Sequence, residues 1–131
     1  MNFTLYIVGG KYPSFYKAAI KEYEKRLSRY CKLKTVILKN SEQLESKVAE
    51  GLYCIGIHPS GELISSEGLA DKISTYATQG NSSIALILGQ EGQHETLALS
   101  KMEMEAGLSH TVLLEQIYRA YRILGNEPYH K

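Results

Sequence analysis

Short apolar runs alternate along the chain with longer segments in which apolar residues recur every three or four positions. The apolar runs predict strands at 3–8, 33–38, 53–57 and 84–88. The helical spacing predicts helices at 15–30, 41–50, 66–79 and 108–124. Strands that are apolar throughout are typical of a parallel sheet covered on both faces, so the pattern predicts a three-layer α/β domain with a mainly parallel sheet.

The residues between these segments predict where each element begins and ends. Ser14, which follows Pro13, is the expected N-cap of the first helix, and Asn40 or Ser41 is the expected cap of the second. The third strand is expected to run into a loop at 58–61. One face of the first helix is expected to carry Phe15, Ala19, Tyr23, Leu27 and Tyr30.

The regular alternation breaks after the fourth strand. The turn Gly89-Gln90-Glu91-Gly92 follows that strand directly, at the edge where open α/β sheets bind ligands. An ordinary turn would have the same composition, because glycine is what turns need. Residues 93–107 have no strong period and predict an irregular segment of about fifteen residues, a length that is usually functional in a compact domain.

The last helix is apolar over too broad a face for a helix exposed on a monomer. Its apolar residues at helical spacing are Val112, Leu113, Ile117, Tyr118, Tyr121 and Leu124. This face is expected to pack against both the sheet and a second chain.

The chain has 131 residues, of which 44% are hydrophobic and 22% charged, and this composition predicts a single domain over 1–131. No apolar run reaches the length of a membrane helix, and the first ten residues lack the basic region of a signal peptide. We therefore expect a cytoplasmic protein with no membrane partner. Cys31 and Cys54 stand apart from any metal-ligand pattern, so we expect buried thiols and no metal.

Charge is distributed unevenly although the net charge is only +1. Residues 1–50 hold ten Lys and Arg against five Asp and Glu, whereas residues 51–131 hold five against nine. Such an asymmetry hints at a first half that faces a polyanion, and it is also what a solvated helix face produces.

The end of the chain carries a resemblance to a known family. Residues 113–123 and the tail Glu127-Pro128-Tyr129-His130-Lys131 resemble the C-terminal signature of the RlmH family of SPOUT-class methyltransferases, which act on 23S ribosomal RNA. Further matches occur in the family's order: Gly9-Gly10-Lys11, Lys21-Glu22-Tyr23, Gly61 followed by Ser65-Ser66-Glu67, and the turn at 88–92.

The resemblance implies a SPOUT fold whose C-terminal segment forms a trefoil knot, a rare exception to the rule against knots. It further implies a homodimer that binds S-adenosyl-L-methionine in the knot, at the subunit interface. The implied reaction transfers a methyl group to N3 of a pseudouridine in 23S rRNA of assembled ribosomes.

The family's cofactor contacts correspond to particular positions of this chain. Ile57 matches the apolar residue at the end of the third strand, and Gly89 matches the second glycine of the turn. The family's cofactor loop matches Leu99, Ser100, Lys101, Met102, Glu103 and Met104. In such a site backbone groups bind the adenine and apolar side chains form the walls, although core packing alone would also explain Ile57 and Leu99.

This chain departs from the family pattern around that loop. His58 replaces an Asp, Leu88 replaces a Gly, and Glu103 replaces a Thr. The stretch between Gly92 and Leu99 is about eight residues shorter than the pattern, which removes most of a helix. Four carboxylates are expected near the cofactor, where they would attract its sulfonium and repel phosphates: Glu91, Glu95, Glu103 and Glu105.

Methyl transfer to an imide nitrogen requires that the nitrogen lose its proton. The tail and last helix offer His130, Tyr129 and Arg119, with Arg122 beside them, as a base or an oxyanion stabiliser. His130 titrates near neutrality, but a histidine at this end of a chain is also often solvated. His94 and His110 have no partner motif and are interpreted as structural or surface residues.

Lys17, Lys21, Lys25 and Arg29 stand four residues apart and form one basic stripe on the first helix. Given the resemblance, this stripe is a candidate RNA contact; a solvated helix partly neutralised by Glu22 and Glu24 is the alternative. Two other functions also remain open. One is a degenerate homologue that dimerises and binds ribosome or RNA without methylating, and the other is a generic nucleotide-binding α/β domain.

Overall fold

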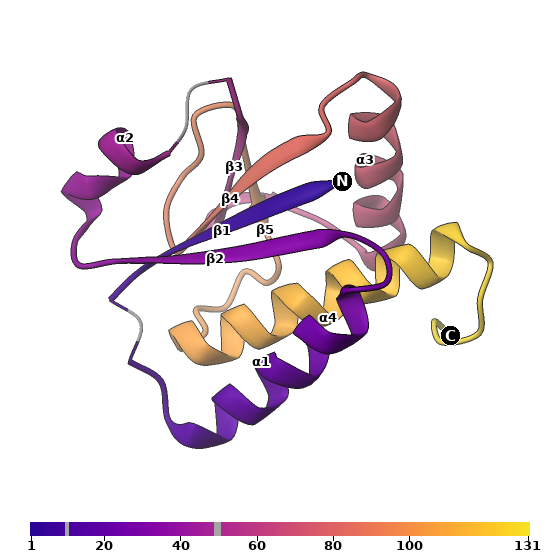
Figure 1. Ribbon diagram of the computed structural model, residues 1–131, viewed down its shortest axis with the longest axis horizontal. Helices are drawn as coiled ribbons and strands as arrows, with labels where there is room; N and C mark the ends of the chain where they lie inside the picture. The colour runs from indigo at the N-terminus through magenta and orange to yellow at the C-terminus, as the bar shows by residue number, and fades with distance from the viewer. Residues whose placement is uncertain (10, 49–50) are drawn as a thin grey trace.

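The computed structural model describes residues 1–9, 11–48 and 51–131, so Gly10 and the expected helix end at Glu50 lie outside the described residues. Five strands form one sheet in the order β2-β1-β4-β3-β5, and every pairing between them is parallel (Figure 1). The strands are β1 Asn2–Val8, β2 Lys32–Leu38, β3 Tyr53–Leu63, β4 Ser83–Leu88 and β5 Glu95–Ala98. The predicted α/β fold with a parallel sheet is confirmed.

Three long helices cover one face of this sheet. They are α1 Ser14–Leu27, α3 Ser66–Thr78 and α4 Ala106–Leu124, and α1 lies beside α4 (Figure 1). A short 3₁₀ turn, Ser41–Gln43, leads into the four-residue helix α2 Leu44–Lys47. The chain is extended again at Val48, so this helix is shorter than the expected 41–50. None of the helices among the described residues is long and apolar enough to cross a membrane.

The two faces of the sheet are buried unequally. The main core joins the strands to the three long helices, and its fully buried members include Leu5, Ile84, Leu113 and Ile117. The opposite face has a small cluster of Tyr6, Leu38, Cys54, Ala85 and Ile87, on which α2 and its neighbours pack. The layers are therefore present but unequal. Both cysteines are buried free thiols, as expected.

Helix α1 begins one residue earlier than expected. Pro13 occupies the N-cap position in an extended conformation, and Ser14 is the first helical residue, so the prediction of a Ser14 cap is wrong. The packed face shifts accordingly, because Phe15 is 66% exposed while Ile20 and Leu27 are buried. Tyr16 takes the inner position at this end of the helix, and an added Cβ at Gly107 of α4 would lie 2.4 Å from its ring.

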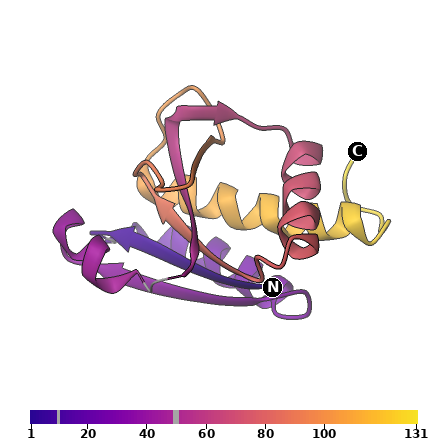
Figure 2. The same ribbon diagram turned by 90° about the horizontal axis from the view of Figure 1, so that it is seen from above.

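Strand β3 extends past the predicted end at residue 57 and bends near its end (Figure 2). Ile57 and Glu62 both pair with Leu97 of β5, so residues 58–61 are extruded from the ladder. The expected loop is thus a bulge within one long strand. An added Cβ at Gly61 would lie 2.5 Å from the Thr96 carbonyl oxygen, so only glycine lets the strand return to β5 there.

The segment 93–107 contains a strand, β5, which contradicts the expected irregular segment. Among the described strands, its four residues pair with β3 alone. The polar residues Glu95 and Thr96 leave no apolar run in this part of the sequence. The Glu95 carboxylate accepts hydrogen bonds from the hydroxyls of Tyr53 (2.9 Å) and Tyr76 (2.6 Å) and from Lys72. Burial raises the pKa of Glu95, but these hydrogen bonds outweigh it and leave the pKa below its ordinary value. The network holds the edge strand to α3.

The chain passes from β4 to β5 across β3 in only six residues, 89–94. Parallel strands ordinarily need a connection of about a dozen residues or more. Two glycines permit the short path, because an added Cβ at Gly56 would lie 2.2 Å from the Gly92 nitrogen. His94 then pairs with Cys54 through both its backbone N–H and its Nδ1 atom.

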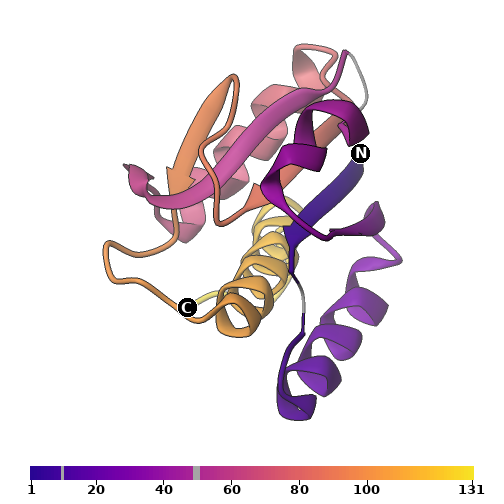
Figure 3. The same cartoon turned by 90° about the vertical axis from the view of Figure 1, so that its left-hand side faces the viewer.

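Helix α4 begins at Ala106, two residues before the expected start, and it ends at Leu124 as predicted. Leu113 and Ile117 of the predicted face are buried, whereas Leu124 is 43% exposed. The chain reaches α4 through residues 99–105, which extend outward from the body before the helix begins (Figure 3). The trefoil knot implied by the resemblance stays a prediction.

Candidate functional site

A cavity of about 450 Å³ opens at the carboxyl edge of the sheet. The ends of β1 and β4 and the start of the β3 bulge form its floor, and the chain that leaves β5 forms one wall. Ala106 and Ser109 of the first turns of α4 close it. The lining residues from the strand ends are Ile7, Val8, Ile57, His58, Pro59, Leu88, Gly89 and Gln90. Ligands of open α/β sheets bind at this edge.

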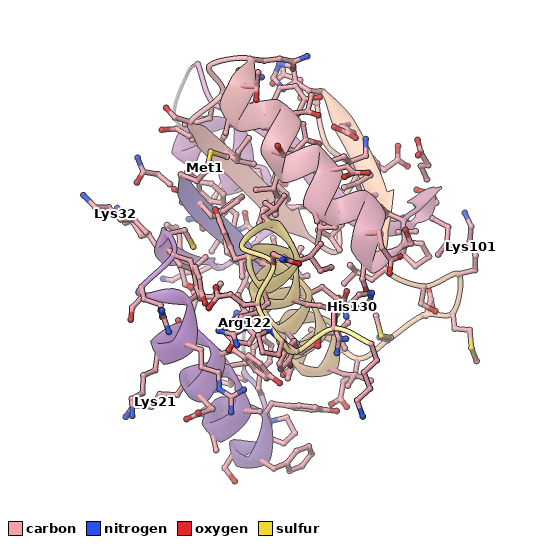
Figure 4. The ribbon with its side chains drawn as sticks, turned by 90° about the vertical axis from the view of Figure 1, so that its right-hand side faces the viewer. Met1, Lys21, Lys32, Lys101, Arg122 and His130 are labelled. Atoms are coloured by element: carbon pink, nitrogen blue, oxygen red, sulfur yellow. The ribbon has the colours of Figure 1, made fainter. Side chains whose placement is uncertain are left out.

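The structure brings together seven of the eight positions predicted to bind the cofactor. Those that line the cavity are Ile57, Gly89, Leu99, Ser100, Met102, Glu103 and Met104. Lys101 does not line it. Its Nζ atom donates to the Gly61 carbonyl oxygen at 2.9 Å, and the side chain lies at the periphery in Figure 4. This bond ties the loop to the bulge in β3.

The turn after β4 presents backbone rather than side chain to the cavity. Gly89 has φ +80°, its N–H donates to the Ile57 carbonyl at 2.8 Å, and an added Cβ would meet no atom within 4 Å. A residue with a side chain would be strained in this conformation. Ile57 and Leu88 are buried and give the cavity an apolar floor, while Met102 is 77% exposed at its rim. This combination suits a flat, partly apolar ligand.

Only one of the four carboxylates expected around the cofactor lines this cavity, and it is Glu103. Glu91 lines a separate cavity beside α2, and Glu95 is bound by Lys72. Glu105 accepts a hydrogen bond from the Tyr16 hydroxyl at 2.9 Å. The expected accumulation of negative charge is therefore wrong, because Glu91 in the connection from β4 to β5, Glu95 in β5 and Glu105 before α4 all face other parts of the molecule.

The catalytic candidates gather in a tail cluster, made of Glu67, Glu115, Arg119, Tyr129 and His130. Arg119 forms an ion pair with Glu115 (2.6 Å) and approaches His130 Nδ1 (3.1 Å), and His130 Nε2 contacts the Glu67 carboxylate. The Tyr129 hydroxyl donates to Glu115 at 3.3 Å. Hydrogen bonding to His130 lowers the pKa of Glu67, and burial followed by the Tyr23 hydrogen bond raises the pKa of Tyr129.

A second set of contacts fixes the turn that leads to this cluster. Arg122 forms an ion pair with Glu127 at 2.8 Å and donates to the Pro128 carbonyl at 2.8 Å. The Tyr30 hydroxyl donates to Glu127 at 2.8 Å and accepts from Arg122 at 3.1 Å. Arg122 therefore holds the tail in place, which is a structural use of a residue also considered for catalysis.

The cavity and the tail cluster use opposite ends of α4. Ser109 lines the cavity and Arg119 belongs to the cluster, and ten helical residues span about 15 Å. The lining of the cavity includes none of Arg119, Tyr129 and His130. Within one chain the structure does not bring the predicted catalytic residues to the predicted cofactor residues.

The predicted RNA contacts lie in a row on the outer side of α1 and just beyond it. Lys17, Lys21, Lys25 and Arg29 are all exposed, and Lys21 extends away from the body in Figure 4. None of these four side chains forms an ion pair with another described residue. The Arg29 guanidinium lies 5.1 Å from the centre of the Tyr30 ring.

Sequence reasoning overlooked several residues near the cavity. His58, Pro59 and Ser109 line it, and their positions after a predicted strand and near a helix start were the available signal. His110, next to Ser109, is 3% exposed, and neither ring nitrogen has a hydrogen-bond partner among the described residues. Burial lowers the pKa of His110 to about 4. The burial of His110 agrees with its interpretation as a structural residue. Nothing in the sequence indicated that its ring nitrogens would be without hydrogen-bond partners among the described residues.

Comparison with known proteins agrees with the geometry. A family model described as "Predicted SPOUT methyltransferase" matches residues 1–130. This chain belongs to the SPOUT methyltransferase family. A relative from Thermoanaerobacter sp. (strain X514), "Ribosomal RNA large subunit methyltransferase H 1", is 46% identical over 133 residues that cover both chains completely. Relatives named "Ribosomal RNA large subunit methyltransferase H" from Clostridium novyi (strain NT) and Clostridium botulinum (strain Alaska E43 / Type E3) are 37% and 36% identical over 159 residues, again across both chains completely.

These matches confirm the resemblance to the RlmH family, and they refine the prediction of a shortened member. Aligning 131 residues over 159 positions leaves 28 positions at which this chain has no residue, which exceeds the eight expected near the cofactor loop. The Thermoanaerobacter relative of this SPOUT family member aligns completely over 133 positions, so it has at most 133 residues. The short form is therefore shared with at least one curated relative.

Proposed function

We propose that this protein methylates ribosomal RNA of the large ribosomal subunit in the cytoplasm, with S-adenosyl-L-methionine as methyl donor and N3 of a pseudouridine in 23S rRNA as acceptor. The observation that carries the proposal is the cavity at the carboxyl edge of the sheet, where seven positions that match the family's cofactor contacts converge. The names of the curated relatives support the ribosomal substrate.

The residues of the cavity fit that donor. Gly89 leaves room for a ring to lie against the backbone, and Ile57 and Leu99 supply apolar walls that exclude water. The Glu103 carboxylate at the same cavity complements a positive sulfonium. When bound, S-adenosyl-L-methionine supplies an electrophilic methyl group, so the protein's main task is to position the acceptor nitrogen in line with it.

The separation of cavity and tail cluster supports a homodimer as the working unit. Two α4 helices packed antiparallel would place the tail cluster of each chain beside the cavity of the other. There the His130 Nδ1 atom would exchange its contact with Arg119 for the target nitrogen and accept the proton from it, while Nε2 keeps its contact with Glu67 and Tyr129 lies beside the ring. The Arg119 guanidinium would stabilise the resulting negative charge.

The exposed row on α1 supports contact with the RNA backbone. Lys17, Lys21, Lys25 and Arg29 have no acidic partner among the described residues and repeat about every 6 Å along the helix. Such cations bind phosphates without reading sequence. In this proposal they orient the protein on the ribosome, and the cavity selects the nucleotide.

Calorimetry with S-adenosyl-L-methionine and mass spectrometry of 23S rRNA test the two halves of the proposal. We expect saturable cofactor binding at one site per chain, and loss of N3-methylated pseudouridine when the gene is deleted. Absence of binding at millimolar cofactor, with ribosome binding retained, would favour a homologue that dimerises and binds ribosomes without methylating. Binding of a different nucleotide in its place would favour a generic nucleotide-binding domain.

A further inference from the structure

The cations of this chain fall into two groups that differ in their partners. Lys72, Arg119 and Arg122, all after residue 51, form ion pairs with Glu95, Glu115 and Glu127. Within the described part of the first half, only Arg26 has such a pair, with Glu22. Among the first-half cations that form no ion pair with a described carboxylate, two lie on a strand rather than on α1, namely Lys32 and Lys34 of β2.

Strand β2 is one of the two edge strands of the sheet, and it is the first strand after α1. Lys32 and Lys34 pair in register with Asn2 and Thr4 of β1, and being two residues apart they share one face of the strand. That face is opposite to the one carrying Leu33, which packs on the main core with α1. Lys32 nevertheless extends to the same side of the molecule as Lys21, away from Lys101 (Figure 4).

The sheet face under these lysines is unusual for a parallel sheet. Such sheets are normally covered on both faces, yet the first residues of β1, β2 and β4 on this face are polar: Asn2, Thr4, Lys32, Lys34 and Ser83. Helix α2 packs only on the apolar cluster of this face, which includes Leu38 and Ile87 at the other ends of the strands. The polar part of the face is left to solvent or to a partner.

We propose that Lys32 and Lys34 extend the α1 row into one basic edge, made of Lys17, Lys21, Lys25, Arg29, Lys32 and Lys34, that docks on the phosphate backbone of ribosomal RNA. The inference rests on the proposed function for its partner and adds the β2 edge to it. Charge complementarity identifies the occupant, because six cations along α1 and the adjoining edge strand, none of which forms an ion pair with a described carboxylate, match a dense polyanion.

Protection of a sheet edge is the competing explanation for these two lysines. Edge strands offer unpaired backbone groups, and lysine on an edge strand hinders pairing with other chains. The two explanations differ in what a neutral substitution does. Loss of RNA affinity follows from the docking role, whereas aggregation without loss of affinity follows from edge protection.

The test compares the double variant Lys32→Gln with Lys34→Gln against a control with the same charge change, Ser74→Glu with Ala77→Glu on the exposed side of α3. Binding to protein-free 23S rRNA and to ribosomes is measured between roughly 50 and 200 mM salt. The β2 variant should bind both probes about tenfold more weakly. The slope of the logarithm of affinity against the logarithm of salt concentration should become shallower by about two, one for each phosphate that the lysines no longer neutralise. The control should match the wild type in salt dependence.

Unchanged affinity and salt dependence in the β2 variant would overturn the proposal, and aggregation with unchanged affinity would assign the lysines to edge protection. Weaker binding to ribosomes alone, with 23S rRNA unaffected, would indicate a protein partner and would also overturn it. Calorimetry with the cofactor distinguishes a failure of this proposal from a failure of the proposed function. Both variants should bind S-adenosyl-L-methionine like the wild type, and a wild type that binds rRNA but no cofactor would refute the methyltransferase proposal while leaving the basic edge in place.

Discussion

The two ends of α4 differ in how their polar groups are satisfied. At its beginning, Ala106 and Ser109 face a cavity with an apolar floor, and the neighbouring His110 has no hydrogen-bond partner among the described residues. At its end, Arg119 hydrogen-bonds to Glu115 and His130, and Arg122 hydrogen-bonds to Tyr30, Glu127 and the Pro128 carbonyl. Of these two guanidinium groups, only the Arg122 Nε atom is buried without a partner among the described residues.

This difference separates two roles that methyl transfer needs together. The beginning of α4, at Ala106 and Ser109, is its open end, which has room for a ligand and few side chains with acid–base chemistry. The other end, at Arg119 and Arg122, is its closed end, which has such side chains and no cavity of that size among the described residues. A single chain therefore holds two incomplete halves. Pairing of two chains in opposite directions would complete both halves at once.

The largest effect is expected at the closed end. Replacing His130 with Ala should lower kcat by about 10²–10⁴-fold, because a positioned general base contributes that much, while the cofactor dissociation constant stays unchanged. Mixing this variant with Gly89→Val at limiting cofactor should restore about a quarter of wild-type activity, since half of randomly assembled dimers are mixed and each has one complete site. Methylation of unmodified ribosomes measures both. Activity that stays at the level of the separate variants would mean that each tail serves its own chain.

The next effect concerns the backbone beneath the open end. In Gly92→Ala the new Cβ would lie 2.2 Å from both the Gly56 nitrogen and the Glu95 carbonyl oxygen, so the crossover or β3 must move. The free energy of unfolding should fall by about 3 kcal/mol or more, as in severe overpacking, and urea denaturation measures it. Gly80→Ala is the control, because Gly80 has φ +84° with no atom within 4 Å and should lose only about 1–2 kcal/mol. Equal losses in the two variants would contradict the close crossing.

The order and type of the elements could be predicted from the sequence because they depend on local periodicity. Strands β1, β2 and β4 and helices α3 and α4 match their predicted ranges to within two residues. The missed strand, β5, has only four residues, and it is stabilised by distant partners such as Tyr53, Tyr76 and Lys72, which no local pattern contains.

The cofactor part of the candidate site could be predicted, because it depends on the order of the strands and on the resemblance to the family. Ile57, Gly89 and the loop at 99–104 meet because parallel strands end at one edge, and Lys101 departs from them through its bond to Gly61. The orientation of Glu95 and Glu105 was not predictable, because it depends on which neighbour each carboxylate reaches. The remoteness of His130 from the cavity likewise follows from the length of α4 and not from any motif.

The free energy of unfolding should depend on pH through His110, near the beginning of α4. His110 has a folded-state pKa of about 4, below its ordinary 6.5, so the unfolded chain binds the extra proton between these values. Its contribution to stability is thus complete above pH 6.5 and is lost as the pH falls toward 4, by roughly 3 kcal/mol. Urea denaturation at pH 7.5 and pH 4.5 measures the loss, and His110→Leu should remove most of this component. An identical pH dependence in the variant would show that His110 is solvated or paired in solution.

The smallest effect is expected on cofactor affinity, when the backbone beside the cavity is changed at Gly89. Gly89→Val places a branched side chain at φ +80° where Gly89 now meets open space, so it should block the approach of a ring to the backbone. The dissociation constant of S-adenosyl-L-methionine should rise about tenfold by calorimetry, which corresponds to about 1.4 kcal/mol. Gly80→Val carries the same strain at φ +84° but lies beyond α3, away from the cavity, so its cofactor affinity should match the wild type. Because strain is common to both variants, only the position of Gly89 distinguishes them, and equal affinities would remove this turn from the cofactor site.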